Sequence, residues 1–286
     1  MTTLVVGARG NVGRSVVDQL LAAGQTVRAS VRRTVGDEFP AEVEVVTADL
    51  ADPDSFARAL TGVRKVFLYA PAPDQVSAVI SVLEKAKLEL VVQLSSGSVL
   101  LESAAGNAIA EEHREVEEAF SRADLPWIPI RPLVLATNDL RWDVREPVKL
   151  VYPQARTAPI HEHDIAAVSV AALTHAVDPE VAAGMLTGGE LLSQAERVAL
   201  IAEAVGCQPQ IQELTEAEAR KVFGGGATPG AGSDSRGGDS QPDAILAFIR
   251  DAAAGGSPAT NAVQTALGRA PLPYRQWVAD HRLDFS

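Results

Sequence analysis

Short apolar runs alternate with amphipathic stretches along the first half of the chain. The apolar runs are rich in valine, isoleucine and leucine, which is typical of buried strands. The expected strands are Thr3–Val6, Thr26–Ser30, Val43–Val46, Val63–Tyr69, Leu90–Leu94 and Trp127–Ile130. The expected helices between them are Val12–Ala23, Asp54–Leu60, Asp74–Lys87 and Ile109–Ala123. Strands that alternate with helices at this spacing predict a parallel sheet with helices on both faces.

The second half, after about Leu133, alternates less regularly. Two capping boxes, each a serine or threonine followed three residues later by glutamate, mark helix starts. They are Ser193-Gln-Ala-Glu196, whose helix is expected to run to about Val205, and Thr215-Glu-Ala-Glu218. Further helices are expected at His163–His175, Asp243–Ala253, Asn261–Leu267 and Pro273–His281. Residues 224–243 are rich in glycine, serine and proline, so we expect a flexible loop there, either a lid over a pocket or a tolerated insertion.

Composition narrows the classes of partner. Lysine and arginine number 25 against 37 aspartates and glutamates, a net charge of −12 that disfavours nucleic-acid and anionic-membrane partners. The single cysteine, Cys207, excludes an intrachain disulfide and a multi-cysteine metal site. The chain enters an apolar run without a basic leader and has no uninterrupted apolar stretch of ~18 residues, so neither a signal peptide nor a membrane span is expected. We expect a cytoplasmic monomer or homodimer that acts on a small molecule.

A glycine-rich segment joins the first expected strand to the first expected helix, with the sequence Gly7-Ala8-Arg9-Gly10-Asn11-Val12-Gly13. Gly7 permits a tight turn, Gly10 lets the backbone approach a pyrophosphate, and Gly13 allows the helix to pack closely on the strand. Free backbone amides and the positive end of the helix dipole then bind the anion. The alternative is a turn without a ligand, but the position after the first strand favours a dinucleotide site.

The end of the second strand indicates which dinucleotide is bound. NAD sites usually carry an aspartate or glutamate about 20 residues after the glycines. Here Ser30, Arg32 and Arg33 take that place, and the fork of an arginine matches a 2′-phosphate. Arg9 can join this basic group. The alternative is that these arginines are solvated charges on the surface. We therefore expect NADP(H) to be preferred over NAD(H).

Two further strands end in residues that can line the same site. Asp49 and Leu50 follow the third strand, where Asp49 can accept a hydrogen bond from the adenine amino group. Tyr69, Ala70 and Pro71 follow the fourth strand and can flank the nicotinamide ribose. A helix cap or a simple turn is the alternative for each group.

Together these motifs resemble the atypical short-chain dehydrogenase/reductase superfamily, specifically its NmrA-like, NAD(P)H-binding branch. The matching pieces follow in order along nearly the whole chain and are Gly7–Gly13, Arg32, Ala48-Asp49-Leu50, Leu94-Ser95-Ser96-Gly97, Ile130-Arg131-Pro132, His163-Asp164-Ile165-Ala166-Ala167 and Trp277–Phe285. The resemblance implies an α/β fold: a Rossmann-like, doubly wound parallel sheet over residues 1–135, and a smaller, mainly C-terminal α/β substrate domain over residues 136–286, with some segments returning to the first domain. It also implies relatives as different as quinone reductases, iminium reductases and redox-sensing regulators without turnover.

In that family the usual catalytic set is a serine after the fifth strand, then a tyrosine and a lysine four residues apart on the next helix. Ser95 and Ser96 stand at the serine position, whereas His113 and Glu117 take the positions of the tyrosine and lysine. Residues spaced i and i+4 share a helix face and can form a hydrogen bond. We expect Glu117 to raise the pKa of His113 so that it serves as a general acid, the alternative being a solvent-facing polar pair.

The cofactor and catalytic residues form one side of the expected substrate pocket. We expect the opposite side to come from the segment after the sixth strand and from the second portion of the chain. Candidate substrate contacts are Leu133, Val134, Asn138, Trp142 and Tyr152, although such residues can equally form the core between domains.

A run of histidines and acids, His161-Glu162-His163-Asp164, raises the question of a metal. The two histidines are two residues apart, which places them on different faces of a helix, and no third ligand is evident. We therefore expect a helix start and no metal site.

The expected function is an NADP(H)-dependent reductase that transfers hydride to an activated small organic substrate of the quinone, enone or iminium type. Such electrophilic acceptors need orientation more than acid catalysis, whereas interconversion of ketones and alcohols needs a good proton donor. The alternatives are an NADP(H)-sensing regulatory protein without turnover, and a non-redox tailoring enzyme that keeps the dinucleotide for structure.

Overall fold

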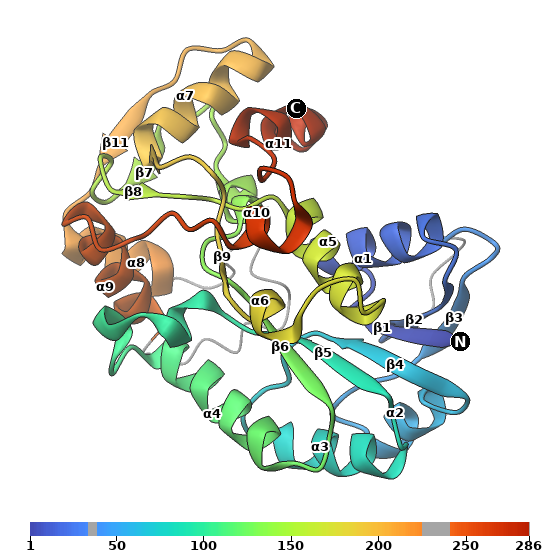
Figure 1. The fold of residues 1–286 in the computed structure, drawn as a ribbon. Helices are drawn as coiled ribbons and strands as arrows, with labels where there is room; N and C mark the ends of the chain where they lie inside the picture. Colours follow the sequence, from blue (N-terminus) through green and yellow to red (C-terminus); the bar gives the residue numbers. More distant parts are fainter. Residues whose placement is uncertain (34–38, 225–240, 286) are drawn as a thin grey trace.

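The computed structural model describes residues 1–33, 39–224 and 241–285, and within this part seven parallel strands form one sheet (Figure 1). The strand order is β3-β2-β1-β4-β5-β6-β9. The strands are β1 (Thr2–Val6), β2 (Thr26–Val31), β3 (Glu44–Thr47), β4 (Val63–Leu68), β5 (Leu90–Leu94), β6 (Trp127–Pro132) and β9 (Met185–Leu186). Each of the six pairings is parallel, which confirms the predicted doubly wound sheet.

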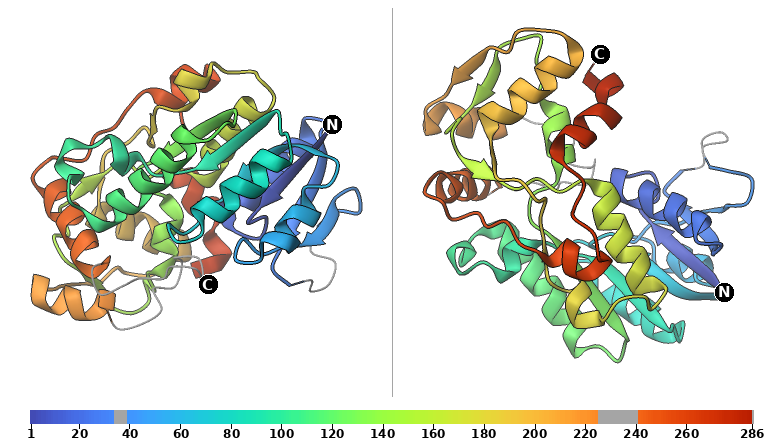
Figure 2. Two further views of the ribbon diagram at one scale, coloured as in Figure 1. Left: turned by 90° about the horizontal axis from the view of Figure 1, so that it is seen from below. Right: turned by 45° about the horizontal axis from the view of Figure 1, so that its top comes forward.

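Helices cover both faces of this sheet (Figures 1 and 2). Helices α1 (Asn11–Ala22) and α5 (Glu162–Leu173) pack on one face. The other face is covered by α2 (Pro53–Ala59), α3 (Val76–Lys85) and α4 (Ala108–Arg122). Side chains alternate between the two faces along each strand, so Val5 of β1 belongs to the core under α1 and Leu4 to the core under α3.

A second group of short elements follows β6. Two small sheets pair β7 (Val148–Leu150) with β11 (Ile211–Glu213), and β8 (Arg156–Thr157) with β10 (Leu192–Ser193). The helices of this half are α6 (Pro179–Ala182), α7 (Gln194–Val205), α8 (Glu216–Gly224), α9 (Gln241–Ala253), α10 (Ala262–Leu267) and α11 (Tyr274–Asp280). The 3₁₀ turns of the chain are η1 (Gly97–Leu100), η2 (Glu102–Ala104), η3 (Ala136–Arg141) and η4 (Arg282–Phe285).

Elements from beyond residue 135 also build the sheet portion. Strand β9 is one of its two edge strands, and α5 packs beside α1. The division at residues 135 and 136 itself stays a prediction. Most of the predicted flexible loop, residues 225–240, lies outside the described residues.

Both capping boxes form. Glu196 donates its backbone N–H to the Ser193 hydroxyl at 3.1 Å, and the Glu196 carboxylate accepts the Ser193 N–H at 2.7 Å. Glu218 makes the equivalent bonds with Thr215. These reciprocal bonds satisfy backbone N–H groups that have no partner within the helix, which is why the sequence marks both helix starts clearly.

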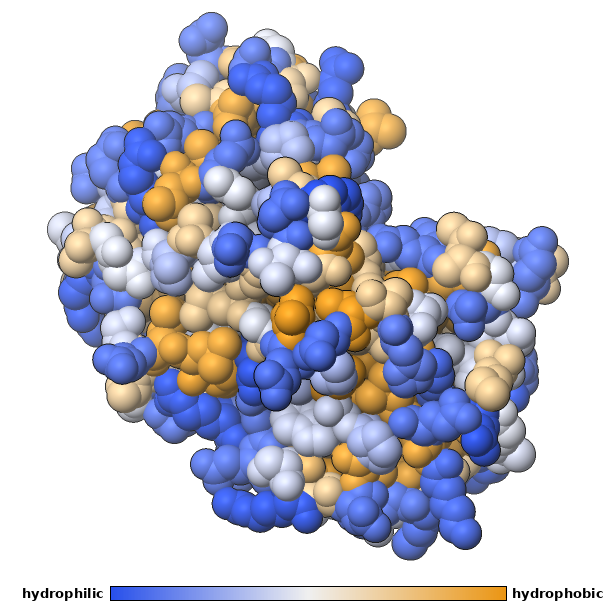
Figure 3. Space-filling view, in the orientation of Figure 1, coloured by the Kyte–Doolittle hydropathy of each residue, from blue (hydrophilic) through white to orange (hydrophobic). Residues whose placement is uncertain are grey.

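Hydrophilic residues cover most of the face drawn in Figure 3, and apolar residues gather near its middle, where the second half meets the sheet portion. None of the described helices is both long and apolar enough to cross a membrane.

Candidate active site

The residues predicted to bind the cofactor, together with Ser95, follow strands that end at one edge of the sheet. Because the strands are parallel, their carboxyl ends meet at that edge, which is where ligands bind in such folds. Gly7 follows β1, Arg32 follows β2, Tyr69 follows β4 and Ser95 follows β5. From β2 to β5 there are three strand spacings, about 14 Å at ~4.8 Å each. This span suits an extended dinucleotide.

The glycine turn has the geometry that each glycine was expected to provide. Gly7 has a φ of +76°, a conformation that favours glycine. A Cβ at Gly13 would lie 2.2 Å from the carbonyl oxygen of Gly7, so α1 packs directly on the turn. A Cβ at Gly10 would meet no described atom within 4 Å except that same oxygen at 3.4 Å. The outer side of Gly10 is therefore open to a close approach.

The first turn of α1 can receive an anion. Gly10 is the N-cap residue, no side chain caps the helix, and its first turn holds no acidic residue. The backbone N–H groups at a helix start have no partner within the helix, and the helix dipole adds positive potential there. Ala8 and Val12 are buried beneath the turn and shape it by packing, whereas Arg9 and Asn11 are exposed. This arrangement fits a diphosphate.

Basic side chains stand at the ends of two neighbouring strands. Arg32 and Arg33 are exposed just after β2, and Arg9 is exposed just after β1, the strand that pairs with β2. Ser30 is buried at the end of β2. A cationic edge of this kind fits a 2′-phosphate.

The residues after β3 and β4 take mixed roles. Asp49 is exposed, and one of its carboxylate oxygens accepts the N–H of Ala51 at 2.9 Å in a turn. Leu50 packs against the core under α2. Tyr69 lies against the glycine turn, its Cβ 3.1 Å from where a Cβ on Gly7 would stand. Ala70 is half-buried and Pro71 is buried.

A hydrogen-bonded triad joins three elements at the end of β5. Ser95 is buried and donates to Glu117 of α4, with 2.6 Å between Oγ and Oε1. Arg131 of β6 donates to the same carboxylate from Nε at 2.8 Å and from Nη2 at 2.6 Å. Arg131 also donates to the carbonyl oxygen of Ala183 at 2.7 Å. The triad Ser95–Glu117–Arg131 therefore ties α4 to β5 and β6.

The expected hydrogen bond between His113 and Glu117 does not form. An arginine fork offers a carboxylate two parallel charge-assisted bonds, so Arg131 takes the partner predicted for the imidazole. The expected rise in the pKa of His113 is also wrong: burial lowers this pKa, and the charge of Glu117 offsets that effect only in part. Burial therefore favours the neutral form of this imidazole. Ser96 caps η1 and pairs with Ser98, their hydroxyl oxygens 2.8 Å apart.

Sequence reasoning missed Arg131 as a partner of the site. The available signal was an arginine within an otherwise apolar, buried strand, because a charge in such a strand requires a compensating partner.

The predicted wall residues occupy different surroundings. Trp142 is buried in the core of the second half, with the guanidinium of Arg197 4.9 Å above its ring, so it takes the core role that the sequence left open. Val134 is buried, Leu133 is half-buried and Asn138 is exposed. Tyr152 donates its hydroxyl to Glu216 at 2.6 Å. A substrate role for these residues stays a prediction.

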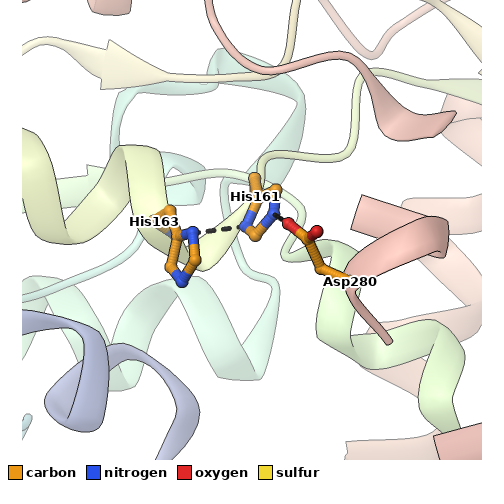
Figure 4. Close-up of side chains that lie close together, drawn as sticks. All are labelled: His161, His163 and Asp280. Carbon is orange, nitrogen blue, oxygen red and sulfur yellow. Dashed lines mark hydrogen bonds and ion pairs between the residues drawn. The ribbon is translucent and has the colours of Figure 1, made fainter. Parts of the chain in front are cut away.

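The histidine cluster differs from its expected geometry (Figure 4). His161 is the N-cap of α5 and not a helical residue, so its ring stacks on that of His163, with centroids 4.6 Å apart. Asp280 of α11 supplies a third group, its Oδ2 3.2 Å from Nε2 of His161. These three side chains offer ligand atoms within 4.8 Å of one another. Stacked rings do not direct their lone pairs at one point. His281, at the end of α11, adds a second link to α5, its Nε2 2.6 Å from Oε1 of Glu162. We interpret His161, His163, Asp280, Glu162 and His281 together as a clamp between α5 and α11.

The clamp is expected to weaken as the pH rises. Burial lowers the pKa of His161, but Glu162 and Asp280 outweigh it and raise the pKa above 6.5; Glu162 and Asp284 do the same for His281. A histidine whose pKa is raised by folding contributes its full stabilisation below its unfolded pKa of 6.5. This contribution is lost as the pH rises through the pKa of the folded state. Thermal midpoints measured from about pH 6 to pH 9 should fall accordingly, and less steeply in His281→Gln.

The matched control for this experiment is His175→Gln, at an exposed histidine on the segment after α5. It should keep the slope of the wild-type protein. An unchanged slope in His281→Gln would contradict the clamp.

Comparison with known proteins gives consistent results. Residues 7–176 match a family model described as NAD(P)H-binding. The chain is 30% identical to the (4-alkanoyl-5-oxo-2,5-dihydrofuran-3-yl)methyl phosphate reductase of Streptomyces griseus, over 99% of both chains. It is 29% identical to the nitrogen metabolite regulation-like protein bik4 of Gibberella fujikuroi, over 69% of this chain and 71% of that one. Among solved structures, the NADPH-dependent quinone oxidoreductase of Escherichia coli, complexed with NADPH, has a TM-score of 0.74 at 18% identity, covering 98% of this chain and 99% of that one.

Proposed function

The chain belongs to the NAD(P)H-binding family, and from this premise we propose that it is an NADP(H)-dependent reductase of an activated small organic acceptor of the quinone, enone or iminium type. The observation that carries the proposal is the open glycine turn after β1, which stands at the same edge of the sheet as Ser95, two strands away. We further propose a cytoplasmic monomer or homodimer.

The coenzyme, when bound, supplies a hydride from its nicotinamide ring. The amides at the start of α1 would hold the diphosphate, and Arg32 would hold the 2′-phosphate. Tyr69, which follows β4 between the glycine turn and the end of β5, would flank the nicotinamide ribose. These roles follow from the order of the strands along the carboxyl edge.

The triad restricts the chemistry of the acceptor. The hydroxyl proton of Ser95 is committed to Glu117, and both oxygens of Glu117 are held by Arg131. Burial favours the neutral form of His113, and a neutral imidazole is a weak acid. Reduction of a simple ketone develops an alkoxide that needs a good proton donor, whereas hydride addition to an enone or a quinone gives a delocalised anion that solvent can protonate. The site therefore favours conjugated acceptors.

The relative from Streptomyces supports the same class. By its name, that enzyme's substrate carries a ring double bond beside a ring carbonyl and an alkanoyl group, which is a conjugated acceptor. We propose that this chain, too, reduces a conjugated acceptor.

A second candidate is an NADP(H)-sensing regulatory protein without turnover. The similarity to the regulation-like protein of Gibberella favours it. So does the lack of a free proton donor in the triad.

One assay separates the two candidates. Purified protein is mixed with NADPH and a panel of quinones, enones and cyclic iminium compounds, and the absorbance of the reduced nicotinamide is followed. Oxidation that matches product formation supports the reductase; tight NADPH binding with no oxidation across the panel supports the sensor. His113→Ala slows turnover only if the imidazole touches the acceptor.

Coenzyme preference gives a separate prediction. Arg32→Ala is expected to weaken NADPH binding by ~10–100-fold and leave NADH binding unchanged, because a charge-assisted contact contributes about 1.5–3 kcal/mol. The measurement is a fluorescence titration with each coenzyme. Arg58→Ala is the matched control, since Arg58 is exposed near the end of α2, which leads to the opposite edge of the sheet. Equal losses for NADPH and NADH would refute the assignment.

A further inference from the structure

Arg141, the last residue of η3, differs from the other arginines of the chain. Among the half-buried or buried arginines that the structure describes, it alone has no hydrogen bond and no carboxylate within ion-pair distance. Its one specific contact in the described residues is the ring of Phe223, 5.9 Å from its guanidinium carbon. A guanidinium keeps its charge at any physiological pH, so burying it without a partner costs free energy.

The acid whose charge acts on Arg141, Asp139, is paired with other residues. Asp139 accepts two hydrogen bonds from Arg197, at 2.7 and 2.6 Å, and one from the Tyr274 hydroxyl at 2.6 Å. Three of the roughly four acceptor positions of this carboxylate are thus taken, and Arg197 adds a second positive charge nearby. Burial accordingly lowers the pKa of Arg141, an effect that Asp139 opposes and Arg197 adds to. A chain with 37 acidic residues could supply a partner, so the uncompensated charge marks a place for a ligand.

The position of Arg141 relates it to the proposed active site. The segment that carries it leaves the carboxyl end of β6, the strand beside β5, and Ser95 stands at the end of β5. On its other side lies Phe223 of α8. This contact with the ring uses none of the N–H groups of Arg141 in a hydrogen bond, and these are the groups that bind an oxyanion in a bidentate way.

We propose that Arg141 binds an oxyanion substituent of the substrate, so that the substrate class is a conjugated carbonyl compound bearing a phosphate, sulfonate or carboxylate group. This inference rests on the proposed reductase function and deepens it. Arg141 would determine specificity by orienting the acceptor, and it takes no part in the hydride transfer.

The first test compares two acceptors that differ in one anionic group, naphthoquinone and naphthoquinone sulfonate. Arg141→Leu should raise the KM for the sulfonated quinone by ~10–100-fold and leave the KM for the neutral quinone unchanged, as expected for one lost charge-assisted contact. Arg141→Lys should restore part of the loss. The control is Arg145→Leu, at an exposed arginine four residues further on. Equal effects on both quinones, or on neither, would overturn the inference.

The second test does not depend on turnover. Binding of phenyl phosphate and of benzoate to the NADPH-saturated protein is measured by calorimetry, and Arg141→Leu should weaken it at least tenfold. If no quinone is reduced but this binding is lost in the variant, the reductase proposal fails and the anion site stands. If the variant and the wild-type protein bind both anions equally, the anion site fails even where quinones are reduced. The two ligands also distinguish a preference for phosphate from one for carboxylate.

The stability of the variant is a third readout. Removal of an unpaired, half-buried charge should leave the urea midpoint of Arg141→Leu equal to or above that of the wild-type protein. A clear fall in the midpoint would indicate a structural role and count against a ligand role.

Discussion

Gly13→Ala is expected to weaken NADPH binding at least ~100-fold, which corresponds to about 2.8 kcal/mol. The added Cβ would lie 2.2 Å from the carbonyl oxygen of Gly7 and 2.8 Å from its carbonyl carbon. Backbone atoms cannot yield as the end of a flexible side chain can, so the turn and the start of α1 must move apart. The amides that would hold the diphosphate then lose their common direction. Fluorescence titration with NADPH measures the loss.

Gly24→Ala is the matched control for this prediction. Gly24 has a left-handed backbone, with a φ of +68°, but a Cβ there would meet no described atom within 4 Å, in contrast to Gly13. The control should lose some stability and keep its affinity for NADPH. Far-UV circular dichroism identifies the folded fraction of both variants, so the affinity refers to folded protein. Affinity in folded Gly13→Ala within threefold of the wild-type value would contradict a diphosphate site at this turn.

Asp139→Ala is expected to lower the free energy of unfolding by about 3–5 kcal/mol. The side chains of Asp139 and Arg197 are only 1% and 6% exposed, and they pair at 2.6 Å. Without the carboxylate, Arg197 keeps its charge in a buried site, and the buried hydroxyl of Tyr274 also loses its acceptor. An uncompensated buried charge costs far more than the pair contributes when it is intact. Urea unfolding, followed by tryptophan fluorescence, measures the change.

The double variant Asp139→Leu with Arg197→Met distinguishes charge from packing. It removes both charges and keeps apolar volume, so it should recover most of the stability lost in Asp139→Ala. A double variant as unstable as the single one would show that the loss arises from packing around Trp142 and Tyr274. A single variant within ~1 kcal/mol of the wild-type protein would show that the pair is unimportant.

Local patterns predicted six of the seven strands of the sheet, because each of these six is an apolar run, and most of the helices around them are long and periodic. The strands of the second half are only two or three residues long, too short for any period, and β7 to β11 were missed for that reason. The helix α5 was predicted to begin at His163, whereas it begins at Glu162 with His161 as its N-cap, and this difference underlies the wrong expectation for the two histidines.

In the candidate site, too, the local geometry could be predicted from the sequence and the long-range contacts could not. The glycine turn is local, so seven consecutive residues contained its whole geometry. The partners of Glu117 and Asp139 are long-range: Arg131 is 14 residues away from Glu117, and Arg197 and Tyr274 are 58 and 135 residues away from Asp139. A sequence reveals that a buried acid needs a cation, but the choice among 25 basic residues depends on the folded topology. For the same reason His113 lost its predicted partner.

The contribution of α11 and η4 to the second core has a consequence for synthesis. Tyr274, Trp277 and Phe285 fill the cluster around Trp142 and Val198, so this core cannot close until residues 274–285 have left the ribosome. By contrast, six of the seven sheet strands are complete once residue 132 has emerged. From then until residues 274–285 have emerged the second core stays open, and this is the interval in which chaperones would have most to protect.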